Sequence, residues 1–181
     1  MNADHARLAA SFRERAENLY RTGQYLCAES ILLALNRGFN GPLTDDQAVG
    51  ISAGMVDGMG GSGCLCGAVG GAALAIGLLL GQDAPHARRM DIRQAVNELH
   101  VWFKAEHGSA CCRVLSKKIK DDKAAHFNQC ANLTGKAAEK AALILLERRP
   151  ELARDIDAAA LHARESKLGG RLKWALRFLC R

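Results

Sequence analysis

Cysteines are the residues of this sequence with the clearest chemical potential. Seven occur among 181 residues. Six of them fall in four segments and the seventh lies near the C-terminus: Cys27, Cys64 with Cys66, Cys111 with Cys112, Cys130, and Cys180. Thiolates bind iron and zinc, and they attack disulfides. A chain of this length can bury a core without covalent staples, so these thiols predict a metal centre or a redox site. For any single cysteine, a place in the apolar core is the ordinary alternative.

The cellular compartment and the partners of this protein can be predicted from the start of the chain and from its charge. Charged residues recur through Glu17, without the apolar stretch of a secretory signal, so we expect a cytoplasmic protein. In a reducing compartment, cysteines at mixed spacings are metal ligands or redox thiols rather than a disulfide framework. The net charge of +6 is spread along the chain and aromatics are few, which predicts no nucleic-acid partner. The apolar stretch 68–81 is shorter than the roughly 20 residues of a transmembrane helix.

Helices must position the cysteines, because alanine and leucine recur at three- and four-residue spacings and β-branched residues are sparse. We expect an all-α fold, a compact single-domain bundle of about seven to nine helices with a glycine-rich loop. The expected helices are residues 4–21, 25–37, 44–56, 68–81, 85–106, 111–120 and 132–148, with a further segment at 122–130. Every cysteine segment before the last then lies near a helix start or break, where the positive end of the helix dipole stabilises thiolate.

A glycine cluster precedes the apolar helix and lacks side chains with which to pack as a helix. We interpret it as a loop that wraps closely around a bound group, with backbone amides that donate to sulfur. The glycines expected to line such a cluster are Gly60, Gly61, Gly63 and Gly67.

The order of these motifs resembles the C_GCAxxG_C_C family of redox proteins. The match runs from about Leu19 to Glu147 and includes Gly23 to Glu29, the glycine cluster, and 66–71, which reads C-G-A-x-x-G. The family's four cysteines then fall on Cys27, Cys66, Cys112 and Cys130. The resemblance implies a compact helical redox domain, similar to the domain of split-Soret cytochromes that is associated with an iron–sulfur centre in a dimer. No Cys-x-x-Cys-His occurs, so this chain lacks the haem attachment of those cytochromes.

Four residues beside the family cysteines are possible additional ligands. Cys64 and Cys111 neighbour family cysteines in sequence, and His107 and His126 precede Cys111 and Cys130 by four residues. That interval places two side chains on one helical face, so a histidine could replace a thiolate as ligand. The ordinary interpretation of a histidine near a helix end is a capping or surface residue.

These observations lead to one main hypothesis of function and two alternatives. The main one is electron transfer or redox sensing through an iron–sulfur cluster, most simply [2Fe–2S], held by the four family cysteines, with a redox partner protein and a homodimeric assembly. The first alternative is a thiol–disulfide oxidoreductase or sensor without metal, in which Cys64 or Cys66 is the thiolate activated by a helix start. The second is structural zinc binding. No catalytic triad, carboxylate pair or phosphate loop is present, so no catalytic residue is assigned.

The sequence also predicts a division of the chain. Residues 1–149 form the cysteine-rich redox domain, and 150–181 form a C-terminal amphipathic helical extension. Its last segment, 171–181, combines apolar and basic residues, which suits either a docked helix or contact with a membrane surface.

Overall fold

The computed structural model describes residues 2–169 and is all-helical, which confirms the predicted fold class. Within this range no strand is formed. The helices are α1 (Ala3–Arg21), α2 (Cys27–Gly38), α3 (Asp45–Ser52), α4 (Val56–Met59), α5 (Gly67–Gly81), α6 (Arg89–His107), α7 (Cys112–Ser116), α8 (Lys123–Arg148) and α9 (Ala158–His162), with short 3-10 helices at Ala53–Met55 and Pro150–Arg154.

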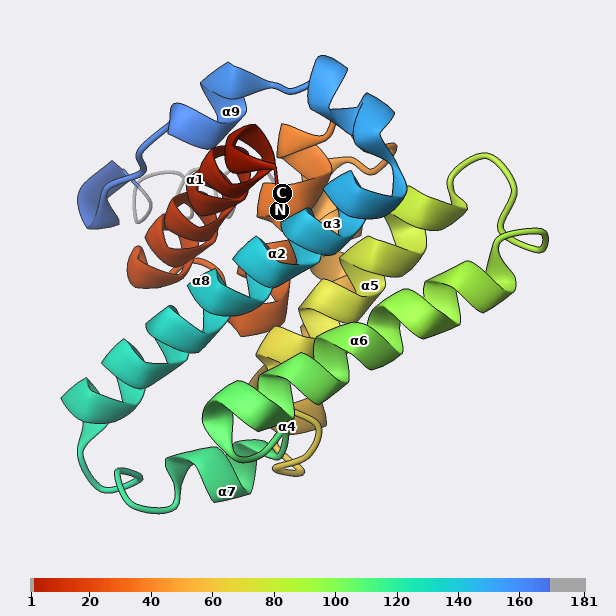
Figure 1. Ribbon diagram of the computed structural model, residues 1–181. Helices are drawn as coiled ribbons and strands as arrows, with labels where there is room; N and C mark the ends of the chain where they lie inside the picture. The colour runs from red at the N-terminus through yellow and green to blue at the C-terminus, as the bar shows by residue number, and fades with distance from the viewer. Residues whose placement is uncertain (1, 170–181) are drawn as a thin grey trace.

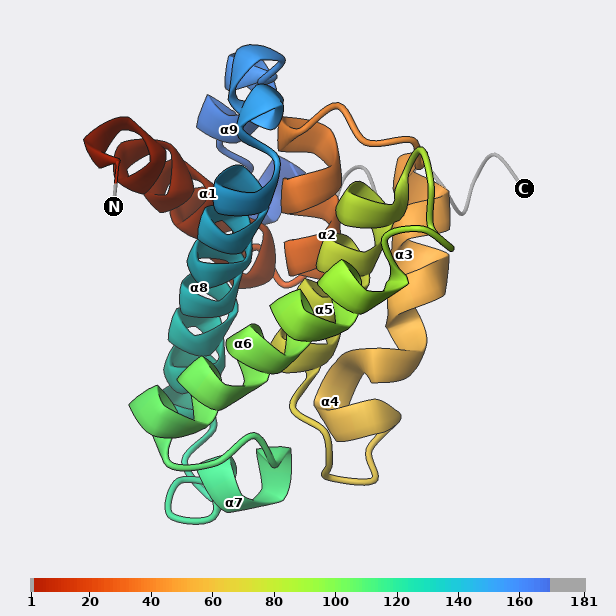
Figure 2. The same cartoon turned by 45° about the vertical axis from the view of Figure 1, so that its right-hand side comes forward.

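The apolar helix α5 is the centre of the bundle and packs against α2, α6 and α8, while α1 runs along α8. Close approach of α5 to α2 requires Gly71, because a Cβ at that position would lie 2.6 Å from the Ala28 carbonyl oxygen. The short helices α4 and α7 lie together at one end of the bundle, and α9 lies at the opposite end (Figure 1 and Figure 2). None of the helices described is long and apolar enough to cross a membrane.

Several helix ends are capped. The Thr44 hydroxyl accepts from the Gln47 amide at 3.3 Å, and the Gln47 side chain accepts from the Thr44 amide at 2.9 Å. Gly108 ends α6 in the left-handed conformation, with φ +77°. These caps satisfy backbone groups that a helix end would otherwise leave unpaired.

Several helix boundaries differ from the sequence prediction; the helix expected over 111–120, for example, ends at Ser116. Residues 122–130 and 132–148 form one continuous helix, α8, because Ala131 and Leu133 are buried and nothing interrupts the backbone there. The expectation that Cys130 lies at a helix start or break is therefore wrong. The helix expected over 44–56 ends at Ser52, and the chain then turns through Asp57, which has φ +54°. Helix α6 begins at Arg89 rather than at Pro85.

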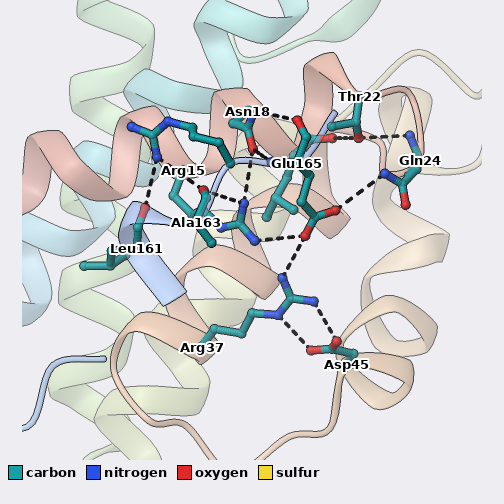
Figure 3. Close-up of polar contacts among 11 residues, drawn as sticks. Arg15, Asn18, Thr22, Gln24, Arg37, Asp45, Leu161, Ala163 and Glu165 are labelled. Carbon is teal, nitrogen blue, oxygen red and sulfur yellow. Dashed lines mark hydrogen bonds and ion pairs between the residues drawn. The ribbon is translucent and has the colours of Figure 1, made fainter. Parts of the chain in front are cut away.

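In the C-terminal extension, the 3-10 helix Pro150–Arg154 packs against α8, and α9 packs against α1 and α2. Leu161 is 2% exposed and approaches Gly38 of α2. Figure 3 shows Glu165 between two arginines: its carboxylate lies 3.0 Å from Arg15 of α1 and 3.6 Å from Arg37 of α2. The expected membrane-surface or docked helix at 171–181 and Cys180 lie outside the described residues.

Candidate functional site

One small cavity, of about 30 Å³, is lined by cysteines from four segments of the chain: Cys27, Cys66, Cys112 and Cys130. They come from α2, from the start of α5, from α7 and from α8. The structure thus brings together residues that are separated by as many as 103 positions in sequence. Three of these thiols are partly exposed and Cys66 is buried.

Helix starts position three of the four cysteines. Cys27 is the first residue of α2, Cys66 precedes the first residue of α5, and Cys112 is the first residue of α7. Backbone N–H groups at helix starts lack intrahelical partners and can donate to sulfur. The amides of Ala28 and Asp57 donate to the Cys27 thiol, and the amides of Ala68 and Val69 donate to Cys66.

Backbone pairing between two loops holds Cys66 and Cys112 at the cavity. The Cys66 amide donates to the Ala110 carbonyl at 2.8 Å, and the Arg113 amide donates to the Gly63 carbonyl at 2.9 Å. The pairing is close enough that a Cβ at Gly58 would lie 2.8 Å from the Cβ of Cys112. Gly58 has φ +72°, so this position needs glycine both for space and for backbone conformation.

Glycine is also required at Gly67, where a Cβ would collide with the Sγ of Cys27. Gly67 lines the cavity, but Gly60, Gly61 and Gly63 do not. A Cβ at Gly60 or Gly61 would meet open space. Of the four loop glycines singled out from sequence, Gly67 is the one that lines this cavity.

Burial controls the ionisation of the cavity thiols. It raises the pKa of Cys27 to about 11 and that of Cys66 to about 12, and it also raises the pKa values of Cys112 and Cys130. The expectation that a helix start lowers the pKa of Cys66 is wrong, because desolvation outweighs the two backbone donors. Without a compensating positive charge, these thiols are neutral at pH 7.

Two polar residues of the cavity were not identified from the sequence. Tyr20 of α1 lines it and hydrogen-bonds the Cys130 thiol, which lowers the Cys130 pKa against the larger effect of burial. Asp57 lines it as well, and its negative charge raises the pKa values of Cys27, Cys112 and Cys130. Tyr20 precedes the first family cysteine and Asp57 borders the glycine cluster, but neither position carries a motif.

The four possible additional ligands take different places. His126 lines the cavity, one helical turn before Cys130. His107 lies at the end of α6, where its ring packs 4.6 Å from the Phe103 ring, and burial lowers its pKa. Cys64 and Cys111 lie outside the cavity lining; Cys64 is exposed and Cys111 partly exposed.

The donor set suits a thiophilic metal, because four thiolates are the usual ligands of iron–sulfur clusters and of structural zinc. Over residues 2–169, however, no three histidine, cysteine, aspartate or glutamate side chains are grouped closely enough to hold a metal ion.

The helical fold and the thiol-lined cavity define a cysteine-centred helical protein. The chain belongs to the C_GCAxxG_C_C family, described as "putative redox-active protein", which it matches over residues 25–144. This match confirms the resemblance and contains all four cavity cysteines. No curated protein and no solved structure matches the chain.

Proposed function

We propose that this protein is a redox protein whose four cavity cysteines hold an iron–sulfur cluster, most simply [2Fe–2S], for electron transfer or redox sensing. The observation that supports it is the convergence of Cys27, Cys66, Cys112 and Cys130 on one cavity. When bound, the cluster would supply reversible one-electron transfer. The four thiolates would be the iron ligands, and the positive charge of iron would compensate the cost of their ionisation in a buried site.

The surrounding residues would tune such a centre through hydrogen bonds and exclusion of water. The amides of Asp57 and Ala68 donate to the Cys27 and Cys66 sulfurs, and Tyr20 donates to Cys130. Hydrogen bonds to ligand sulfurs raise the reduction potential of a cluster. Leu133 is 5% exposed and covers one side of the cavity, which limits access of water.

The test is chemical analysis of protein purified without oxygen. We expect iron and acid-labile sulfide in equal amounts, with visible absorption that is lost in Cys66→Ser and Cys112→Ser. The matched controls are Cys64→Ser and Cys111→Ser, each close in sequence to a cavity cysteine but outside the cavity. Protein that stays colourless after reconstitution with iron and sulfide contradicts the proposal, and zinc without sulfide would identify a structural zinc site instead.

A second candidate is thiol–disulfide chemistry among the same cysteines without metal. It is favoured by the absence of a preformed three-ligand group within the described residues. The thiols still interact electrostatically: Cys27 with Cys66 and Cys130, and Cys112 with the same two thiols. We expect this function only if metal-free protein forms one defined disulfide between cavity cysteines, reversibly, and if added iron and sulfide leave its spectrum unchanged.

The proposed assembly is a cytoplasmic homodimer that exchanges electrons with a partner protein. The homodimer is supported by the resemblance to the dimeric split-Soret domain. The cytoplasmic location is supported by the mixed spacings of the cysteines, which do not form a disulfide framework. Light scattering on cluster-containing protein gives the mass in solution, and a monomeric mass contradicts the dimer.

A further inference from the structure

We propose that Cys64 and Cys111 form a second redox centre, a surface dithiol that is oxidised reversibly to a disulfide by exchange with a small disulfide bearing carboxylates. This inference goes beyond the proposed function, because it needs neither a metal nor any cavity cysteine.

The loops that carry the two thiols bring them close together. The Cys111 thiol donates to the carbonyl of Gly63, the residue before Cys64, at 3.1 Å, and the two thiols interact electrostatically. The backbone bonds from Cys66 to Ala110 and from Arg113 to Gly63 lie on either side of the pair. Two thiols held near each other on paired loops can form a disulfide without large backbone movement.

The pair is accessible, unlike the buried thiol of Cys66. Cys64 is exposed and Cys111 is partly exposed, and neither lines the cavity. Exchange requires an incoming disulfide to approach a thiolate sulfur along the S–S axis, so access decides which cysteines of a protein react. By this criterion Cys64 is better placed than any cavity cysteine, and Cys111 is better placed than Cys66.

The charge around the pair favours an anionic disulfide. Arg113 acts electrostatically on both thiols, and its guanidinium donates to the Ser62 carbonyl beside Cys64. Lys117 and Lys118 follow in the same short segment, and both are exposed. A cluster of positive charge raises the local concentration of carboxylate-bearing solutes. Glutathione disulfide has this chemistry and serves as the probe.

The reaction balances in two exchange steps. First, the thiolate of one cysteine of the pair attacks one sulfur of the disulfide RSSR; a mixed disulfide forms, the S–S bond of RSSR breaks and RS⁻ leaves. Second, the thiolate of the other cysteine attacks the protein sulfur of the mixed disulfide, which forms the Cys64–Cys111 bond and releases a second RS⁻. The two protons lost by the protein thiols are taken up by the two RS⁻ groups. The pair is thereby oxidised by two electrons, and RSSR is reduced to two RSH.

The experiment is peptide mapping of the full-length protein after exposure to glutathione disulfide, acid quenching and alkylation. We expect a cross-link between tryptic peptides 38–88 and 105–113, with fragment ions that assign it to Cys64 and Cys111. In Cys64→Ser the cross-link is lost and Cys111 accumulates as a mixed disulfide with glutathione; in Cys111→Ser the roles reverse. Reduction with glutathione restores both thiols in the wild type.

Three results would overturn the proposal: no cross-link in the wild type, a vicinal bond between Cys111 and Cys112, or stable mixed disulfides on both thiols of the pair. Iron and sulfide content gives an independent readout. The Cys64→Ser/Cys111→Ser variant is expected to retain the wild-type content, and its loss would show that the pair ligates metal. A colourless protein that still forms the cross-link would contradict the proposed cluster and leave the surface dithiol standing.

Discussion

Replacement of Glu165 by alanine is expected to destabilise the protein. Its carboxylate is 14% exposed and accepts from Arg15, whose side chain is only 2% exposed. Arg15 also donates to the Asn18 side chain at 3.1 Å and to the Ala163 carbonyl at 3.0 Å. In Glu165→Ala these two neutral acceptors would remain, but a buried guanidinium would lose the anion that compensates its charge.

The expected loss of unfolding free energy follows from the burial of the Arg15–Glu165 ion pair. Removal of one partner from a buried ion pair costs about 3–5 kcal/mol, and the two remaining acceptors place Glu165→Ala near the lower end, at about 3 kcal/mol. For a chain of this size, that loss corresponds to a fall in the melting temperature of about 6–12 °C. Arg37 contributes little to the loss, because it keeps its 2.6 Å contact with Asp45 (Figure 3).

Circular dichroism at 222 nm, with heating and with urea, measures the free energy of unfolding. The matched control is Glu14→Ala, which removes the 2.6 Å ion pair between Glu14 of α1 and Arg164, the residue before Glu165. Both side chains of that pair are exposed, at 66% and 48%, so its removal should cost less than about 1 kcal/mol. Equal effects of the two substitutions would refute the reasoning, since it attributes the difference to burial alone.

Three further predictions concern packing, ionisation and the tuning of the cavity. Gly71→Ala should cost about 1–3 kcal/mol in unfolding free energy, because the new methyl group would meet the backbone of Ala28. The control Gly77→Ala should be neutral or stabilising, because the nearest atom to its new methyl group, on Ile92, is 4.0 Å away. Equal urea midpoints of the two variants would contradict the prediction. Burial raises the pKa of Cys66 to about 12, so in metal-free protein the alkylation rate of this thiol should increase about tenfold per pH unit from pH 9 to pH 11. The folded state should lose stability over the same pH range, because the unfolded chain ionises this thiol first. An alkylation rate that levels off near pH 9 would show an ordinary thiol. Tyr20→Phe removes the hydroxyl that hydrogen-bonds the Cys130 sulfur, so it should lower the reduction potential of a reconstituted cluster, measured by voltammetry. An unchanged potential would mean that this hydrogen bond is absent in the cluster-bound state.

Local patterns made the helices and their caps predictable. The Thr44–Gln47 capping box and the C-cap Gly108 depend on residues within one turn of each other, so a single sequence contains the whole signal. The continuity of α8 depended on burial of Ala131 and Leu133 against other helices, which the local polarity of 128–132 does not reveal. Tertiary packing overrides local propensity in such segments.

The candidate site was predictable only in part, for the same physical reason. Four cysteines could be selected because a motif marks them, but their shared cavity depends on contacts between loops and helices far apart in sequence. Tyr20 reaches the cavity from α1, and Asp57 reaches it through a backbone turn with positive φ, an unusual conformation for aspartate. No spacing rule encodes either position.

The structure separates neighbouring cysteines into two environments. Cys111 and Cys112 are adjacent, yet only Cys112 lines the cavity: Cys111 is the N-cap residue with extended backbone, and Cys112 is the first residue of α7. Cys64 and Cys66 are divided in the same way, with the first exposed and the second buried. A solute can therefore reach the exposed Cys64 more readily than it reaches Cys66. Cys112 is the link between the two environments, since its charge interacts with Cys111 on one side and with Cys66 and Cys130 on the other.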